Sequence, residues 1–571
     1  MGRALALLML LLISGPVMAE VRVNVTGIEG ALRDNVLAFI DERVELDSAL
    51  AARFYRERVR ERVAEALAAL GHYQAQFDLR LVPVQGHWVL EIAVTPGPRV
   101  VLRNIAVRIE GPGANDGAFA RLQTRLPVAA GEGLDHGDYE ASKRALRNLA
   151  RERGYLEHRF VAAELAVNAR EGWADVELIL DTGPRYAFGA VSFSRAPFRP
   201  DFLQRLVPFA PGTPYESDLV ADFNRRLLES GYFDDARVIT QPDDAADGRI
   251  PIRAEVQTRD RNTVSTGVGY STDEGPRLRL GFTRHYINNR GHRLIAESRL
   301  SPQRQALDAR YEIPLADPLR DNLSLSTGWE NEEVDDNRSE RYTISLARRQ
   351  QFTSGWVRTQ SIRWLDERFT AGLDRGRSQL LLPGLSFSRT RSRGGIDPYR
   401  GDHQRYSIEG SARDLLSDVD IARLRLGHTW LRSLGEAHRF QLRADLGGIA
   451  TNDFAATPGS LRFYAGGDQS VRGFAYRSLG PRDASGEVVG GRYLATGSAE
   501  YSYRILGHWR LAVFADAGNA FDHADEYDPE VGTGFGVRWR SPVGPLRVDL
   551  AWGVSRADNP FRLHLSVGPP F

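Results

Sequence analysis

The chain of 571 residues contains no cysteine. Disulfide bonds therefore hold no part of it together, and zinc or iron–sulfur sites built on thiolates are excluded. An exported protein without disulfides normally depends on a large core or on a membrane scaffold. The length is sufficient for about three or four domains.

An excess of charge of either sign is also missing. The 74 basic and 74 acidic side chains give a formal net charge of +0. Without a net positive charge, no overall electrostatic field attracts nucleic acid to the chain. We therefore expect no nucleic-acid partner.

Long apolar runs are rare as well. The mean hydropathy is −0.36, and beyond the first residues no run of about 18 apolar residues occurs, as a membrane-spanning helix would require. This excludes helical spans in the body of the chain. A transmembrane β-barrel stays open, because its strands alternate apolar and polar residues and look polar on average.

The N-terminus carries the pattern of an export signal. A positively charged start at residues 1–3 precedes the apolar stretch Ala4–Ile13 and a small-residue site that ends at Ala19. We expect a signal peptide at residues 1–19, cleaved after Ala19. The alternative, a membrane anchor, would need roughly 20 apolar residues where this stretch has about ten.

The first half of the chain repeats one pattern three times. An amphipathic helix stops at a glycine followed by an aromatic residue, and strand signals follow; the three glycines, Gly71, Gly154 and Gly231, are about 80 residues apart. The pattern predicts three small mixed sheets with the order β-α-α-β-β, over residues 20–97, 98–183 and 184–258. A free edge of such a sheet can pair with an incoming extended chain, although the modules could equally be plain spacers.

The second half alternates apolar and polar residues with a period of two. In one stretch Leu278, Leu280 and Phe282 alternate with Arg277 and Arg279, and the same alternation recurs up to the last strand, about 561–571. Charge on one face and large apolar side chains on the other are typical of a barrel in lipid with a polar interior. Residues 261–571 contain about sixteen such candidate strands, with connections of suitable length.

We therefore predict α+β modules followed by a 16-stranded antiparallel transmembrane β-barrel. A soluble β-sandwich also alternates, but the number of strands, the Tyr and Trp residues near strand ends and the export signal favour the barrel. The acidic stretch Glu330–Asp336 is expected on a long, solvated connection rather than in a calcium site.

A glycine-rich stretch, Gly466–Gly480, lies in the longest connection of this region, about residues 453–490. It contains Arg472, followed by Gly473 and Phe474. Two interpretations fit these residues: an extracellular loop in solvent, or a loop that folds into the polar lumen and pairs Arg472 with an inward carboxylate.

Three motifs near the C-terminus resemble those of the outer-membrane assembly-factor superfamily. "SVRGF" (Ser470–Phe474) resembles the signature loop motif of that family, and "FADAG" (Phe514–Gly518) and Gly532–Trp552 resemble its last strands. The resemblance implies that the loop enters the barrel and that Arg472 contacts Asp516. We call the expected contact between the inward loop and the barrel wall the lumen lock. Its residues are Arg472, Asp516, Gly473 and Phe474.

The three modules resemble polypeptide-transport-associated (POTRA) domains, and three of them before such a barrel resemble the TamA-type members of the family. Further stretches similar to TamA-type proteins are Asn262–Arg277, Ser388–Ile408 and Leu565–Phe571. The resemblance implies a subunit of the translocation and assembly module in the outer membrane of a Gram-negative bacterium, with its POTRA domains in the periplasm. It also implies unfolded β-barrel clients, particularly autotransporters, contact with outer-membrane lipid, and a TamB-type partner anchored in the inner membrane.

Closure of the barrel requires the first and last strands to pair, and both contain residues that weaken pairing. Gly267 and Gly269 lie in the first strand, and Gly568, Pro569, Pro570 and Phe571 end the last. Glycine packs no side chain, and proline cannot donate a hydrogen bond to the ladder. The resemblance implies that this seam is a lateral gate, which a disulfide between Gly267 and Val567 would test; a frayed terminus is the alternative.

Nothing in the sequence indicates catalysis. H-E-x-x-H and G-x-S-x-G motifs are absent, the 12 histidines are scattered, and the glycines of Gly532–Gly536 lie on a strand pattern rather than in a βαβ unit. We expect no enzyme, no catalytic residue, no metal and no cofactor. The alternative function is a polypeptide-exporting pore of the two-partner-secretion type.

Overall fold

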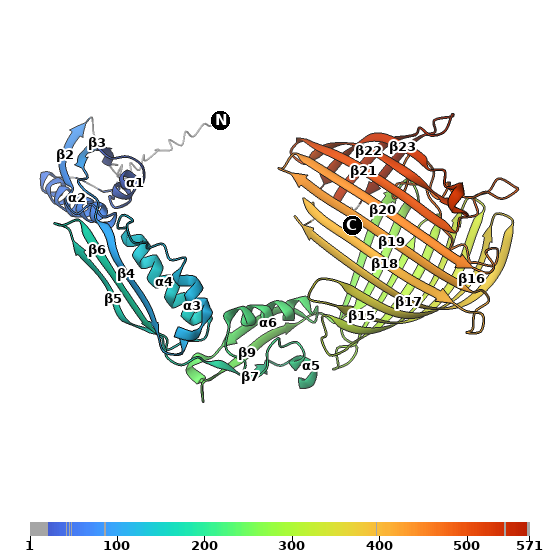
Figure 1. Cartoon of the computed structure of the whole chain (residues 1–571), viewed down its shortest axis with the longest axis horizontal. Coiled ribbons are helices and arrows are strands. Elements are labelled where there is room, and N and C mark those ends of the chain that lie inside the picture. The colour runs from blue at the N-terminus through green and yellow to red at the C-terminus, as the bar shows by residue number, and fades with distance from the viewer. Residues whose placement is uncertain are drawn as a thin grey trace, which may run out of the picture. The chain divides into compact units, whose positions relative to one another are not determined.

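The computed structural model describes residues 21–567, except 42, 45, 47, 85–86, 396 and 542–543. The expected signal peptide and residues 568–571 of the predicted gate lie outside the described residues. The chain divides into two compact units, Met1–Ser192 with Phe209–Ala221 and Ile239–Arg253, and Phe193–Pro208 with Asp222–Val238 and Ala254–Phe571. Figure 1 shows the elements in chain order. Among the described residues, no helix is both long and apolar enough to cross a membrane.

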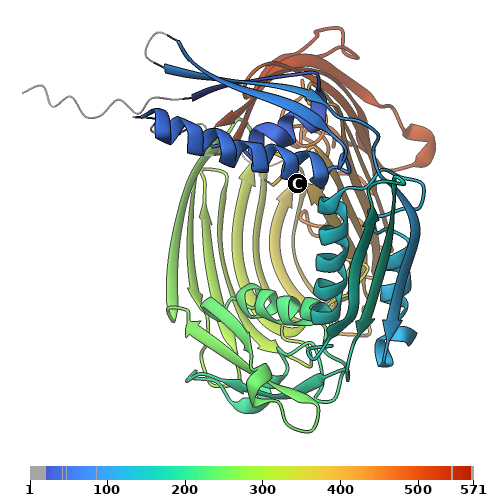
Figure 2. The ribbon, with the colours of Figure 1, turned by 90° about the vertical axis from the view of Figure 1, so that its left-hand side faces the viewer.

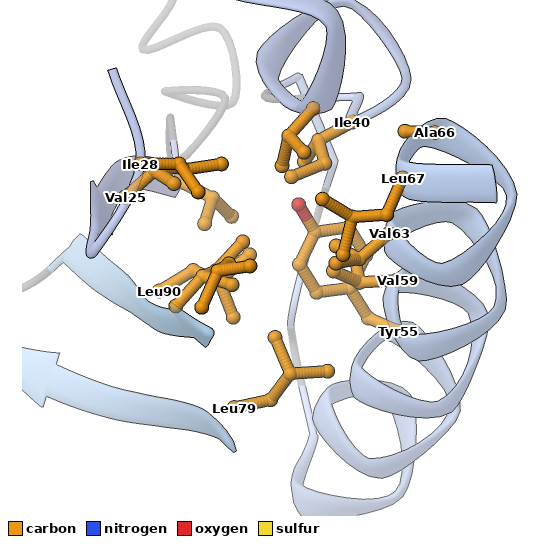
Figure 3. Packing of buried hydrophobic residues seen from close by; sticks show 14 of the residues in the cluster. Val25, Ile28, Ile40, Tyr55, Val59, Val63, Ala66, Leu67, Leu79 and Leu90 are labelled. Carbon is orange, nitrogen blue, oxygen red and sulfur yellow. The ribbon is translucent and has the colours of Figure 1, made fainter. Parts of the chain in front are cut away.

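The first module is a three-stranded sheet covered by two helices. Its elements are β1 (Val21–Thr26), α1 (Gly30–Ala38), α2 (Ala49–Ala69), β2 (Gln76–Val84) and β3 (His87–Thr95). The central strand β3 is parallel to β1 and antiparallel to β2. One face of α2, with Tyr55, Val59 and Val63, packs on Leu90 of the sheet (Figure 3). Gly71 ends this helical segment with a positive φ of 87°, a conformation that favours glycine.

The second and third modules repeat this plan. Their elements are β4 (Val101–Glu110), η1 (Pro112–Asn115), α3 (Gly117–Gln123), α4 (His136–Glu152), β5 (Arg159–Asn168), β6 (Trp173–Asp181), β7 (Ala187–Phe193), α5 (Pro200–Gln204), α6 (Ser217–Glu229), β8 (Phe233–Thr240), η2 (Pro242–Asp244) and β9 (Arg249–Thr258). The strand orders are β4-β6-β5 and β7-β9-β8. The predicted small mixed sheets are confirmed.

The second half closes into an antiparallel barrel of sixteen strands, β10 to β25, as predicted. The strands are β10 (Asn262–Ser271), β11 (Gly275–Arg284), β12 (Arg293–Leu300), β13 (Arg304–Pro314), β14 (Asp321–Val334), β15 (Asn337–Gln351), β16 (Val357–Ala371), β17 (Asp374–Arg393), β18 (Arg400–Ser411), β19 (Ile421–Leu434), β20 (His438–Thr451), β21 (Tyr493–Leu506), β22 (Trp509–Phe521), β23 (Glu530–Ser541), β24 (Gly544–Gly553) and β25 (Phe561–Val567); a short η3 (Ala524–Glu526) joins β22 to β23. Figure 2 shows the strands curving round the wall.

The two faces of the wall follow the period-two pattern. On β11, Leu278, Leu280 and Phe282 are exposed on the outside, and Arg279 between them pairs with Glu297 of β12. We call the end of the barrel at which β10 begins the module end, because β9 of the third module leads into it, and the opposite end the loop end.

The acidic stretch Glu330–Asp336 does not form a long loop, so that expectation was wrong. β14 continues to Val334 and β15 begins at Asn337, which leaves a turn of two residues. Glu330 is buried between Arg304 (2.7 Å) and Arg341 (2.6 Å). The acidic side chains extend the strand because they face arginines inside the barrel, a pairing that sequence alone does not reveal.

Part of the third module belongs to the same compact unit as the barrel and contacts its module end. The hydroxyl of Tyr232 donates a hydrogen bond to the carbonyl of Gly291 (2.6 Å), and the guanidinium of Arg293 lies 4.0 Å from the centre of the Tyr232 ring. Nη2 of Arg226 on α6 donates to Asp317 (3.0 Å) in the β13–β14 connection. These contacts fix the C-terminal half of α6 to the barrel turns.

Candidate functional site

The long connection between β20 and β21, residues 452–492, folds into the barrel. Its apolar side chains Leu461, Phe463, Val471, Phe474 and Leu479 are buried in one cluster with inward residues of the wall, including Leu365, Leu380, Leu382, Ile449 and Leu494. The connection thus builds a core of its own inside the lumen. Of the two interpretations that the sequence left open, the structure shows the inward loop.

Arg472 lies at the centre of this loop and pairs with Asp516 of β22. Nε of Arg472 donates to Oδ2 of Asp516 (2.7 Å) and Nη2 donates to Oδ1 (2.9 Å), while the backbone N–H of Arg472 also donates to Oδ2 (3.0 Å). Arg472 and Asp516 are 5% and 1% exposed. The guanidinium stacks on Phe514, 3.4 Å from the ring centre. This two-pronged geometry gives a charge-assisted pair both strength and direction.

The pair belongs to a larger network of alternating charges. Nη1 of Arg472 also donates to Glu500 of β21 (2.9 Å) and to Asp549 of β24 (3.2 Å). A second arginine, Arg538 of β23, donates to both oxygens of Glu500 (3.0 and 2.7 Å) and to Asp549. Two arginines therefore neutralise much of the charge of two buried carboxylates, Asp516 and Asp549, and of the partly buried Glu500, as charges removed from water require.

The loop reaches the last strand through its backbone. The N–H of Gly473 donates to Nε2 of His564 on β25 (3.1 Å). Gly473 has a φ of +95°, and a Cβ there would lie 2.8 Å from the backbone of Trp552 and Gly553. Through Arg472 and Gly473 the loop therefore contacts β21, β22, β24 and β25, and Arg538 adds β23.

Further polar contacts hold the rest of the loop. Arg462, whose side chain is fully buried, pairs with Asp374 (3.0 Å), and Arg477 pairs with Glu332 of β14 (3.0 Å). The backbone N–H of Ser460 donates to the buried Glu367 (3.1 Å). The backbone N–H of Asp468 donates to Asp273 (2.7 Å) in the turn that follows β10.

A cavity of about 540 Å³ remains between the loop and the wall, with Asp273, Asp468, Arg425 and Arg547 in its lining. Among the described residues, no cluster of three or more His, Asp or Glu could hold a metal ion. The cavity is thus lined by charged side chains of both signs from the loop and the wall.

The structure brings all four residues of the expected lumen lock together. Phe474 is buried and approaches Gly553 of β24, next to the contacts of Arg472, Gly473 and Asp516. Sequence reasoning missed Glu500, Arg538, Asp549 and His564 as members of the network. The available signal was their position on the polar, inward face of adjacent strands, but the register that aligns them is not visible in the sequence.

The residues expected at the gate are described only in part. Gly267 and Gly269 lie on β10 opposite Arg279 and Arg277 of β11. β10 and β25 meet at Ser271 and Ser566, and the N–H of Thr272 donates to the carbonyl of Leu565 (3.3 Å). In this antiparallel register Val567 faces Tyr270, so Gly267 and Val567 are not opposite each other and are unsuitable for a disulfide.

Family models match most of the chain. An "Omp85 superfamily domain" model matches residues 249–571, a "POTRA domain TamA domain 1" model matches residues 22–96, and a "Surface antigen variable number repeat" model matches residues 186–263. The first match alone covers more than half of the chain.

Two curated relatives are named outer membrane protein assembly factor BamA. The outer membrane protein assembly factor BamA of Nitratidesulfovibrio vulgaris is 23% identical over 374 residues, which are 61% of this chain and 46% of that protein. BamA of Neisseria meningitidis serogroup B is 27% identical over 184 residues, 25% of this chain and 23% of that protein. The chain thus spans less than half the length of these relatives.

A solved structure shares the fold. The crystal structure of BamA from Haemophilus ducreyi lacking POTRA domains 1–3 superposes with a TM-score of 0.69 at 16% identity, over 82% of this chain and 99% of that chain. Together with the family matches and the geometry of the loop and barrel, this leads to one conclusion. The chain belongs to the Omp85 superfamily of β-barrel proteins with POTRA domains.

Proposed function

We propose that the chain is an outer-membrane assembly factor of the TamA type, which inserts autotransporters and other β-barrel proteins through the seam between β10 and β25. One observation carries the proposal: the loop and its arginine join the last five strands, β21 to β25, into one cross-braced panel that ends at the seam. Movement at the wall is then concentrated where β25 meets β10.

In this mechanism β10 is the template for a client strand. Its outward side chains are strongly exposed, with Val264 at 72% and Val268 at 87%, and Gly267 and Gly269 place no bulk against a neighbour. A client strand pairs with the edge of β10 by backbone hydrogen bonds, the mode known as β-augmentation. Gly568, Pro569, Pro570 and Phe571 would limit pairing from the other side, because proline has no N–H to donate.

We assign the loop the role of a lumen lock, formed by Arg472, Gly473, Phe474 and Asp516. It blocks the lumen and braces the panel while the seam opens. The modules at residues 20–97, 98–183 and 184–258 then lie in the periplasm of a Gram-negative bacterium, and the barrel at 261–571 lies in the outer membrane.

A TamB-type partner anchored in the inner membrane is the proposed periplasmic partner. The match of residues 22–96 to a first POTRA domain of TamA supports this choice. The first module offers β2 as a sheet edge, and the strand order β1-β3-β2 leaves that edge without a neighbour in its own sheet. A partner strand could add there by the same β-augmentation.

A polypeptide-exporting pore of the two-partner-secretion type is the second candidate. The polar cavity of about 540 Å³ in the lumen favours it, because a pore needs an aqueous interior. The loop argues against it, since four buried or half-buried contacts with the wall must break before a chain can pass.

Insertion of a urea-unfolded autotransporter barrel into liposomes tests the proposal. We expect liposomes that contain this protein to insert the client faster than empty liposomes, with the client protected from protease in the bilayer. Client recovered free in the vesicle lumen would support the pore instead. Equal rates with and without the protein, also after addition of a TamB-type partner, would contradict both.

A further inference from the structure

The outer surface of the barrel carries a row of arginines at the module end of four successive strands. The strands β16 to β19 lie side by side in the wall (Figure 1). The row consists of Arg358 on β16, Arg389, Arg391 and Arg393 on β17, Arg400 on β18 and Arg432 on β19. We call these six residues the arginine rim.

Strand alternation places the rim on the outside. Every second side chain of a strand lies on the same face. On β17, Leu385 and Phe387 are 37% and 36% exposed on the lipid-facing surface, and the same face carries Arg389, Arg391 and Arg393. The register is continuous across the strands: Arg358 faces Phe387, Arg393 faces Arg400, and Arg400 faces Arg432. Arg358 and Arg389 therefore border the apolar band, and the other arginines of the rim continue from there toward the module end.

The rim has a large excess of positive charge. In the described part of β16 to β19, Asp402 is the one carboxylate on the outer face of this end, and it accepts both Nη2 contacts of Arg432 (3.0 and 3.2 Å) and lies 3.7 Å from Arg391. Arg393 and Arg400 are exposed. Six positive charges against one negative charge attract anions to this strip of the surface.

Aromatic rings hold several of these guanidiniums in place. Arg389 lies 4.5 Å from the centre of the Trp356 ring, Arg432 lies 4.8 Å from Trp430, and Arg358 lies 5.5 Å from Phe352. Trp356 also contacts Tyr406, with ring centres 5.8 Å apart. Tryptophan and tyrosine prefer the boundary between hydrocarbon and headgroups, so the rings mark the depth of the rim.

The same level of the wall nearer to the seam has a different chemistry. On β20 to β23 the outward residues at the module end include two pairs in register: His438 and Tyr503, whose rings meet edge to face, and Trp509 and Trp539, whose rings are stacked. These side chains are aromatic, without an arginine among them. These four outward positions on β20 to β23 thus lack the arginines that β16 to β19 carry at the same end.

We propose that the arginine rim binds the phosphodiester headgroups of anionic phospholipids in the membrane leaflet at the module end. A guanidinium presents two parallel N–H donors, and their geometry matches two oxygens of a phosphate group. The acyl chains of the same lipids lie along Ile362, Leu385 and Ile408, which are exposed just beyond the rim. The inference rests on the barrel lying in a membrane and not on client insertion.

Lipid retention provides the test. The full-length protein is reconstituted in vesicles of phosphatidylcholine alone or of phosphatidylcholine with phosphatidylglycerol, extracted in mild detergent, and analysed for bound lipid by native mass spectrometry. We expect the wild type to retain phosphatidylglycerol in excess of its share in the vesicle. The double variant R393Q/R400Q removes two exposed charges of the rim and should lower this preference by roughly fivefold for each arginine.

Arg375→Gln is the matched control, because Arg375 is exposed on the same outward face of β17, at the opposite end of the strand. It should retain phosphatidylglycerol like the wild type, and all three proteins should show the same far-UV circular dichroism. Equal retention by R393Q/R400Q and the wild type would overturn the proposal. Release of the lipid by inorganic phosphate alone would also overturn it, because the site would then recognise the free anion rather than a lipid.

Discussion

Arg472 and Asp516 are joined by two parallel hydrogen bonds, of 2.7 and 2.9 Å, across the gap between a loop and the barrel wall. The two residues are 44 positions apart in the sequence. Because both are buried, neither can exchange its partner for water. The contact is therefore the point at which the position of the loop is determined, and it is the first that we would alter.

Arg472→Ala should detach the loop while the barrel stays folded. The change leaves Asp516 buried without its partner, which typically costs about 3–5 kcal/mol. Limited proteolysis should then cut within residues 452–492, with unchanged strand content by circular dichroism. Arg472→Lys should restore little, since an ammonium lacks the two-pronged geometry.

Arg482→Ala is the control for that experiment, because Arg482 lies on the same loop and is exposed. It should leave the cleavage pattern of the wild type. A loop as resistant to protease in Arg472→Ala as in the wild type would contradict the lock.

Gly532→Ala should displace the loop by a change in the barrel wall, on β23, rather than in the loop itself. A Cβ at Gly532 would lie 1.8 Å from the carbonyl oxygen of Arg472, and backbone at that distance must move. Gly427→Ala, on β19, meets nothing nearer than 4.0 Å and should be tolerated. Hydrogen exchange of the loop amides measures the difference; equal protection in the two variants would show that the contact is dispensable.

The double variant Ser271→Cys with Ser566→Cys should form a disulfide across the seam and stop client insertion. The two residues face each other across the seam, at the spacing of directly opposed residues that a disulfide can bridge. Because the chain has no cysteine of its own, a single bond forms. The oxidised protein should insert clients no faster than empty liposomes, and reduction should restore the rate.

The matched control pairs Ser326→Cys with Ser345→Cys, two serines that face each other across β14 and β15. This bond locks strands away from the seam and should leave the rate unchanged. Full activity of the oxidised seam variant would exclude a lateral gate between β10 and β25.

The contact between the loop and the β10–β11 turn should weaken as the pH rises. Burial raises the pKa of Asp273 from 3.8 to about 8, and the neighbouring Asp468 adds to the shift. A raised pKa favours the protonated carboxyl, so the stabilising contribution is complete below about pH 4 and is lost as the pH rises through about 8. Loop amides around Asp468 should therefore exchange faster at pH 9 than at pH 6, after correction for intrinsic rates. Asp273→Asn removes the titrating group and should abolish this difference; a difference that persists would point to another group.

The sequence predicted more of the architecture than of the network. Glycine stops and the period-two alternation predicted the modules and the sixteen strands because both patterns are local. Glu330 shows the limit. Its stretch of seven residues, rich in acid, is typical of a loop, whereas Glu330 meets arginines from both neighbouring strands and Glu332 meets Arg477 of the long loop. Likewise Glu500 and Asp549 become partners of Arg472 only through strand register, which depends on residues far apart in the chain.

Closure of the barrel joins positions that are extremely distant along the chain. The N–H of Leu565 donates to the hydroxyl of Thr272, 293 positions away (3.3 Å). A contact of this separation carries a large loop-closure entropy and forms after the local hairpins. We therefore expect the first and last strands to meet last when this protein itself folds, which leaves two unpaired strand edges until then. Under the proposed function, the protein itself passes through the same open state as the barrels that it would insert.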